Sequence, residues 1–185
     1  MKEYNALLPL AEGFEEIECV TIVDVLRRAG INVDVAGLKS LDVKGSHGIT
    51  LRADMLLDDV DRDKYNLIVM PGGMPGSVNL RDDERVLELV RYIYSRGGYA
   101  CAICAAPVVL YKACLLDGKK FTIHPSTRDM VDNKAVELDV VVDGRIITGW
   151  SPGAAMKFAL KIVEVLLGNE EVDKLLSAML YEGYK

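Results

Sequence analysis

One cysteine stands at a position where a reactive thiol is expected. Cys104 follows the apolar run 99–103 and precedes Ala105-Ala106 and Pro107, which predicts a tight turn between a buried strand and a helix. This is the arrangement of a nucleophile elbow, with Cys in place of Ser and without the usual flanking glycines. A helix N-terminus favours a thiolate through its dipole and its unpaired N–H groups. A buried cysteine acting as a small apolar residue is the alternative interpretation.

Two kinds of group, backbone amides and carboxyls, could act on a thiolate at that turn. Gly72 and Gly73 end a second apolar run, and their N–H groups could form an oxyanion hole with that of Ala105. A plain glycine turn is the alternative. Glu15 and Glu18 lie one helical turn apart and share a face, so both could point toward the strand ends. A carboxyl buried beside a thiolate tends to stay protonated, so Glu18 is the candidate hydrogen-bond donor to the sulfur.

The two histidines, and Glu16 between the two candidate glutamates, receive weaker predictions. His124 precedes Pro125 and follows a short strand expected over 120–123; it would complete a Cys–His pair for nucleophilic catalysis. A purely structural histidine fits the pattern equally well. His47 is expected at the surface or at an interface. Glu16 is expected to complement the dipole of its helix and to face water.

The other cysteines suggest packing rather than chemistry. Cys101 and Cys104 form a C-x-x-C pair, but in a thioredoxin-like motif the first cysteine opens the helix, whereas Cys101 lies inside the apolar run. Cys19 and Cys114 are expected to be packing residues. There is no second pair at ligand spacing, so we expect no metal site, and no cofactor is predicted.

The elements that must position these residues follow from the apolar pattern. Strands are expected over 4–10, 32–38, 66–70 and 99–103, and helices over 15–29, 83–96, after Cys104, 153–167 and 170–180. Residues 42–51 suggest a small hairpin or an irregular excursion, and 136–142 with 145–148 a hairpin around Asp143-Gly144. The prediction is one α/β domain over 1–185, a flavodoxin-like doubly wound, mostly parallel sheet sandwiched by helices. Ligands bind such sheets beyond the carboxyl ends of the strands.

Charge and composition exclude several classes of protein. With 22 basic and 28 acidic residues the net charge is -6, so the chain lacks the basic excess of a nucleic-acid-binding protein. No apolar run is long enough to cross a bilayer, and residues 1–5 lack the pattern of a secretory signal. Four cysteines in a chain of this size do not make a disulfide scaffold. We therefore expect a cytoplasmic protein without a membrane partner.

Taken together, these segments resemble the ThiJ/PfpI superfamily, and within it the DJ-one (parkinsonism-associated deglycase) branch. The motifs are AEGFEEIE (11–18), VDVLRRAGINVDVAGL (23–38), VMPGGMPG (69–76), AICAAP (102–107), HP (124–125) and the segment 151–166. The resemblance implies that Cys104 is the reactive cysteine, Glu18 a protonated carboxyl bonded to it, and His124 a nearby imidazole. It also implies that Gly73 and Ala105 supply the amides of an anion pocket.

The same resemblance implies a function. Members of this branch are homodimers that respond to oxidative stress, and many act without a cofactor as glyoxalases on methylglyoxal or as deglycases on glycated adducts. The alternative is a redox sensor or chaperone that signals through oxidation of Cys104 to the sulfinate, with little turnover. A protease is not expected, because the histidine lacks an acidic partner at Pro125. Ala106 and Trp150 depart from the branch, and Trp150 puts the shape of the pocket in doubt.

Overall fold

A seven-stranded sheet forms the centre of the computed structural model, which describes residues 3–132 and 135–184. Its strands run in the order β5-β2-β1-β6-β7-β9-β8, and all neighbours are parallel except the antiparallel pair β8 and β9. The strands are β1 (Asn5–Leu10), β2 (Asn32–Gly37), β5 (Met55–Leu56), β6 (Leu67–Met70), β7 (Tyr99–Ile103), β8 (Val140–Asp143) and β9 (Ile146–Gly149). A separate hairpin pairs β3 (Asp42–Lys44) with β4 (Thr50–Arg52).

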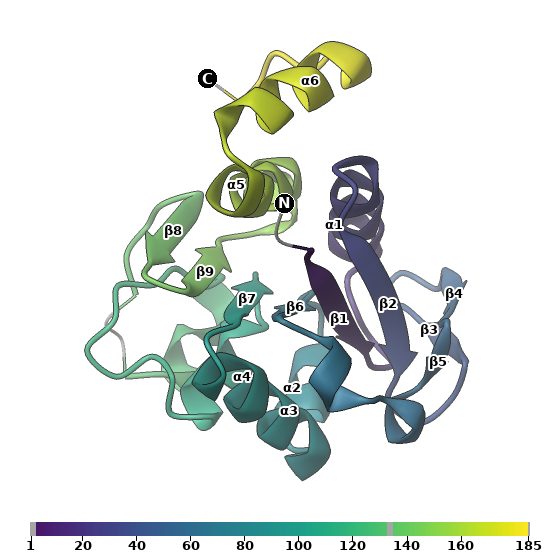
Figure 1. Ribbon diagram of the computed structural model, residues 1–185. Helices are drawn as coiled ribbons and strands as arrows, with labels where there is room; N and C mark the ends of the chain where they lie inside the picture. The colour runs from purple at the N-terminus through teal and green to yellow at the C-terminus, as the bar shows by residue number, and fades with distance from the viewer. Residues whose placement is uncertain (1–2, 133–134, 185) are drawn as a thin grey trace.

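Helices cover both faces of this sheet (Figure 1). One face carries α1 (Glu16–Arg28) and α5 (Ala155–Leu167), and α6 (Asn169–Met179) lies against α5. The other face carries α2 (Gly76–Arg81), α3 (Glu84–Ser95) and α4 (Pro107–Lys112). The predicted α/β fold, a mostly parallel sheet sandwiched by helices, is confirmed.

Side chains of each central strand alternate between two apolar cores, as the two-residue period of a strand requires. On β1, Ala6, Leu8 and Leu10 belong to the core under α1 and α5, whereas Leu7 belongs to the core under α2, α3 and α4. All four side chains are fully buried. A strand buried on both faces reads as a continuous apolar run, which explains why the sequence identified the central strands.

The antiparallel hairpin near the end of the chain is shifted from its prediction. Asp143 pairs with Ile146, so the two turn residues are Gly144 and Arg145 and not Asp143-Gly144. Gly144 has a φ of +62°, which an L side chain rarely adopts, and this fixes the turn at the glycine. The first strand begins at Val140 and not at residue 136.

Two local predictions were wrong or missing. Residues 120–123 form no strand ladder; the segment is held by single bonds, such as the one that Thr122 N donates to Thr148 Oγ1 at 2.9 Å. Helix α2 was not predicted, because its six residues, Gly76–Arg81, are too few to show a helical apolar period. The hairpin suggested for residues 42–51 is confirmed.

The strand order places four carboxyl ends side by side. β1, β6, β7 and β9 are consecutive neighbours, and they end at Leu10, Met70, Ile103 and Gly149. The segments that follow β1, β6 and β7 contain the predicted site residues other than His124, although these segments are far apart in the sequence. No helix in the described part of the chain has the length and apolarity needed to span a membrane.

Candidate active site

The turn after β7 has the backbone geometry of a nucleophile elbow. Cys104 has a φ of +61°, in the left-handed region that residues other than glycine seldom occupy. Its N–H donates to Gly149 O at 2.9 Å, and its carbonyl accepts from His124 N at 2.9 Å. Because both backbone groups of Cys104 are held by neighbouring segments, the thiol is fixed at the edge of the sheet. Only 8% of the residue is exposed.

Glu18 on α1 is completely buried beside that thiol. Gly72 N donates to its Oε2 at 2.6 Å, and the carboxyl also hydrogen-bonds with Cys104. Its other oxygen, Oε1, is buried and has no hydrogen-bond partner among the described residues. A buried carboxylate oxygen without a partner is costly, so the surroundings favour the protonated acid.

The pKa of Glu18 is raised to about 7. Burial is the main cause, and the charge of Glu15 adds to it, while the hydrogen bonds from Gly72 and Cys104 act in the opposite direction. Glu18 therefore keeps its proton to a much higher pH than an exposed glutamate does. A protonated carboxyl can donate a hydrogen bond to the neighbouring sulfur.

Opposing effects act on the thiol of Cys104. Burial raises its pKa, and the charge of an ionised Glu18 raises it further, whereas the N–H groups of Ala105 and Gly73 bond to the sulfur and lower it. The sequence indicated the helix N-terminal groups that favour a thiolate and gave burial only as the alternative in which Cys104 is an apolar packing residue. Since the Glu18 contribution disappears when that carboxyl is protonated, the two groups titrate as a pair. The pocket accommodates one negative charge more readily than two.

Glycine at positions 72 and 73 allows the loop after β6 to pack directly against the start of α1 and the turn after β7. A Cβ on Gly72 would lie 2.7 Å from the Cβ of Cys104 and 2.9 Å from Glu18 Oε2. A Cβ on Gly73 would lie 2.3 Å from Glu15 N, and its φ is +93°. The Gly72 N–H is occupied by Glu18, so of the three amides predicted for an oxyanion hole, those of Gly73 and Ala105 face the sulfur.

His124 approaches the elbow through its backbone. Its N–H bonds to Cys104 O, while its ring nitrogen Nδ1 accepts from Ser126 N at 3.2 Å and lies 2.8 Å from Ser126 Oγ. With Nδ1 accepting a hydrogen bond, the neutral ring carries its proton on Nε2. Ser126 was not predicted, and nothing in its sequence context distinguishes it. The acid–base role of His124 stays a prediction.

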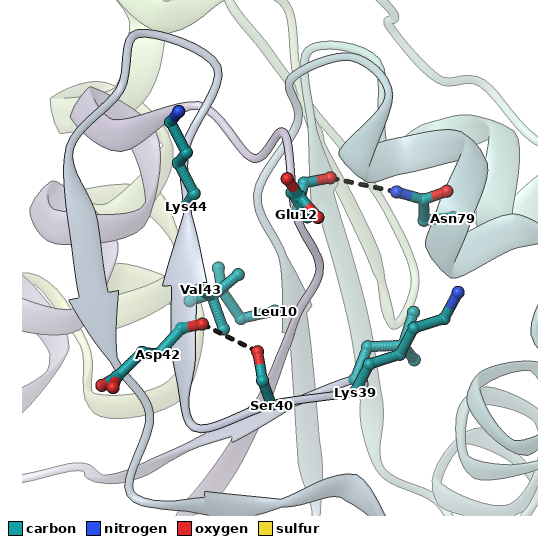
Figure 2. Close-up of a pocket in the computed structure, with 9 residues that line it drawn as sticks. Leu10, Glu12, Lys39, Ser40, Asp42, Val43, Lys44 and Asn79 are labelled. Carbon is teal, nitrogen blue, oxygen red and sulfur yellow. Dashed lines mark hydrogen bonds between the residues drawn. The ribbon is translucent and has the colours of Figure 1, made fainter.

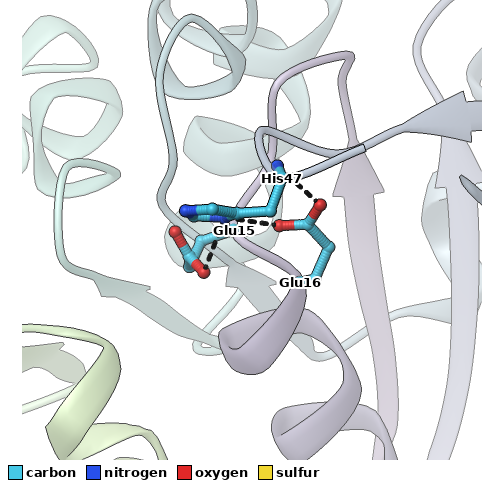
Figure 3. A group of neighbouring side chains, drawn as sticks. All are labelled: Glu15, Glu16 and His47. Atoms are coloured by element: carbon cyan, nitrogen blue, oxygen red, sulfur yellow. Dashed lines mark hydrogen bonds and ion pairs between the residues drawn. The ribbon is translucent and has the colours of Figure 1, made fainter. Parts of the chain in front are cut away.

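Glu15 and Glu16 both turn toward His47 (Figure 3). Glu15 donates its N–H to Gly72 O, but its carboxylate lies 3.5 Å from His47 Nδ1. Its predicted part in substrate binding stays untested. The prediction that Glu16 faces water was wrong: the residue is 5% exposed, because the loop between β3 and β4 folds over it. His47 is exposed, as expected.

The other cysteines divide into buried and exposed groups. Cys19 and Cys101 are buried in the core under α1 and α5, as predicted for Cys19 and for a residue inside β7. Cys114 is exposed, so the prediction that it packs in the core was wrong. It follows the C-terminus of α4 with a φ of +62°, and its side chain lies outside the core, although Leu116 two residues later is buried.

A separate cavity of about 190 Å³ lies near the ends of β1 and β2 (Figure 2). Its lining includes Lys39 and Lys44 as well as Glu12 and Asp42, so opposite charges balance around it. None of the predicted site residues lines this cavity. The chemistry of the candidate site is therefore confined to the elbow and its neighbours.

These features define an α/β protein with a cysteine at a nucleophile elbow. The model of the DJ-1/PfpI family matches residues 4–165, and the chain belongs to this family. Protein dj-1beta of Drosophila melanogaster is 43% identical over 180 residues, which cover 95% of this chain and 96% of that protein. The structure of oxidized DJ-1 from Toxoplasma gondii superimposes with a TM-score of 0.92 at 37% identity, covering 97% of this chain and 99% of that one.

A third relative carries an enzyme name. The glutathione-independent glyoxalase DJR-1.2 of Caenorhabditis elegans is 37% identical over 176 residues, which cover 94% of this chain and 93% of that protein. The superfamily resemblance indicated by the sequence motifs is thereby confirmed.

The raised pKa of Glu18 predicts a measurable loss of stability with pH. Between the ordinary pKa of 4.5 and the folded value of about 7, the folded chain holds a proton that the unfolded chain has lost. Stability therefore falls as pH rises through this window, by about 3 kcal/mol. Glu18→Gln removes this titration. Urea unfolding of both proteins across the window should show the wild type losing about that much relative to the variant.

Glu12→Gln, at an exposed glutamate, is the matched control and should follow the wild type. If wild type and Glu18→Gln change in parallel with pH, Glu18 does not hold a proton in the folded protein.

Proposed function

We propose that this protein is a cysteine-dependent, cofactor-free glyoxalase or deglycase that acts on methylglyoxal or glycated adducts and protects against carbonyl stress. The observation that carries the proposal is the buried Glu18 carboxyl, bonded both to Gly72 N–H and to the Cys104 thiol. The name of the Caenorhabditis elegans relative, a glutathione-independent glyoxalase, supports it.

The geometry suits covalent chemistry on a small dicarbonyl. The Cys104 thiolate attacks the aldehyde carbon of methylglyoxal, forming a C–S bond, and the carbonyl oxygen takes the Glu18 proton to give a hemithioacetal. The N–H groups of Gly73 and Ala105 bond to the sulfur, so they stabilise the thiolate before it attacks.

Proton transfers complete the reaction. A base removes the proton from the hemithioacetal carbon, and protonation of the adjacent carbon yields a lactate thioester. Water then cleaves the C–S bond, which releases lactate and restores the thiol. The net change is methylglyoxal plus water to lactate, with no external oxidant or reductant. Glu18, which lies beside the thiol, and His124, whose backbone N–H bonds to Cys104 O, are the proposed proton carriers.

A redox sensor is the second candidate function. The Toxoplasma gondii structure is that of an oxidized DJ-1, and a thiol that accepts bonds from two amides suits oxidation by peroxide. Each peroxide transfers one oxygen to the sulfur and leaves as water, first to the sulfenate and then to the sulfinate. Sensing requires this oxidation but not turnover.

The interface for a homodimer is proposed on the face formed by α1 and the β3–β4 hairpin. Three large apolar side chains are exposed there: Ile17 (59%), Val20 (50%) and Ile49 (56%). A groove between α1 and β4 continues this apolar surface with Val23 and Leu51. A contiguous apolar face of this kind marks a protein–protein contact.

Methylglyoxal consumption without added cofactor, followed as lactate, tests the enzyme proposal. We expect lactate from the wild type and only background from Cys104→Ser, because the serine hydroxyl ionises far less readily. Glu18→Gln should lower kcat by about 100-fold or more, the usual contribution of a positioned acid or base. Cys114→Ser, at the exposed cysteine, should retain full activity. A wild type that makes no lactate overturns the proposal.

Mild peroxide followed by mass spectrometry tests the sensor proposal. In a Cys114→Ser background we expect two added oxygens on Cys104 and none on Cys19 or Cys101, which are buried. Oxidation together with absent turnover would make sensing the main function. Resistance of Cys104 to peroxide would contradict the sensor proposal and leave the enzyme proposal to the lactate assay.

The charged substitution Val20→Glu should convert the dimer to a monomer, because it places a carboxylate in the apolar contact. Light scattering coupled to size-exclusion chromatography measures the mass. Val142→Glu, at a valine of β8 that is 41% exposed, should leave the mass unchanged. A wild type with the mass of a monomer would refute the proposed interface.

A further inference from the structure

Three side chains with metal-binding atoms converge beside α1, outside the thiol site. Glu15 and Glu16 stand at the N-terminus of the helix, and His47 lies in the loop between β3 and β4 (Figure 3). His47 Nδ1 is 3.1 Å from Glu16 Oε2 and 3.5 Å from Glu15 Oε1. One ligand atom from each residue lies within 4.8 Å of the others. The imidazole nitrogen therefore faces both carboxylates.

A fourth donor completes the group. Ser46 Oγ lies 3.1 Å from His47 Nδ1 and 3.4 Å from Glu16 Oε2. Zinc bound tetrahedrally at about 2.1 Å has ligand atoms about 3.4 Å apart. Four of the six separations among these atoms, from 3.1 to 3.5 Å, are close to this value, and the ligand oxygens of Glu15 and Glu16 lie within 4.8 Å of each other.

The loop also holds Glu16 in a position to act as a ligand. The N–H groups of His47 and Ile49 donate to Glu16 Oε1 at 2.8 and 3.3 Å, which leaves Oε2 directed at Ser46 and the ring. Backbone bonds that fix a carboxylate in this way orient metal ligands in known sites.

We propose that Glu15, Glu16 and His47 bind one divalent transition-metal ion such as Zn²⁺, with Ser46 Oγ as a further oxygen ligand. One imidazole nitrogen together with carboxylate oxygens suits zinc and its neighbours in the first transition row better than Mg²⁺ or Ca²⁺, which take oxygen ligands. In the single chain the His47 side chain is 69% exposed, and it lies beside the proposed dimer face, two residues before Ile49.

The sequence did not reveal this site, and we expected no metal there. Paired cysteines or histidines at ligand spacing are the usual sequence signal of a zinc site, whereas these donors come from two segments that are about thirty residues apart. Only the fold of the β3–β4 hairpin over α1 brings them together. The metal site uses neither Cys104 nor Glu18, but it shares Glu15, whose charge acts on the Glu18 carboxyl.

Zinc affinity, measured by competition with a chromophoric chelator, tests the proposal. The protein carries Cys104→Ser and Cys114→Ser, so that neither of these thiols competes for the metal. We expect one Zn²⁺ per chain, insensitive to millimolar Mg²⁺, and visible d–d absorption when Co²⁺ replaces Zn²⁺. His47→Asn and Glu15→Gln should each weaken binding by at least about tenfold, no less than the loss of an outer-shell partner.

His124→Asn, which removes the other histidine, is the matched control and should bind Zn²⁺ as tightly as its parent. Unchanged circular dichroism would show that the variants are folded. The alternative is that His47 is simply a protonated partner of the two carboxylates. Absent binding, or binding that survives His47→Asn but not His124→Asn, would overturn the proposed site.

Discussion

The arrangement of the site depends on a carboxyl group enclosed where an ionised one would be costly. Glu18 is fully buried, one of its oxygens lacks a partner among the described residues, and the other accepts the short bond from Gly72. This makes protonation the favourable state and turns an acid into a hydrogen-bond donor for the sulfur. It also dictates that residue 72 has no side chain, because a Cβ would occupy the space between Glu18 and Cys104.

The site also depends on the order of the strands in the sheet. The groups around the sulfur follow β1, β6 and β7, and these strands are neighbours because β6 pairs with β1 on one side and with β7 on the other. The elbow is then fixed by two backbone bonds, from Cys104 N to Gly149 O and from His124 N to Cys104 O. Both bonds join backbone atoms, so the residue types at positions 149 and 124 could not have predicted them.

This explains which parts the sequence predicted. The central strands are buried on both faces and read as apolar runs, and Cys104 was located by the small residues that a tight turn requires. Glu16 was misplaced because its environment comes from the β3–β4 hairpin, for which the local pattern of α1 holds no information. Cys114 was misplaced because it was expected to lie late in the helix after Cys104, whereas α4 ends at Lys112. Predictions failed where the burial of a residue depends on segments distant in the sequence or on single backbone hydrogen bonds.

The late position of β9 and α5 in the chain has a consequence for biosynthesis. A ribosome-bound chain that has emerged only as far as β8 lacks Gly149, the acceptor for the Cys104 N–H, and it lacks the helix that covers the core containing Cys19 and Cys101. Three thiols that the finished molecule encloses are thus incompletely covered until the last part of the chain arrives. Translation under oxidising conditions is therefore the period when the molecule is most vulnerable to damage at these sulfurs.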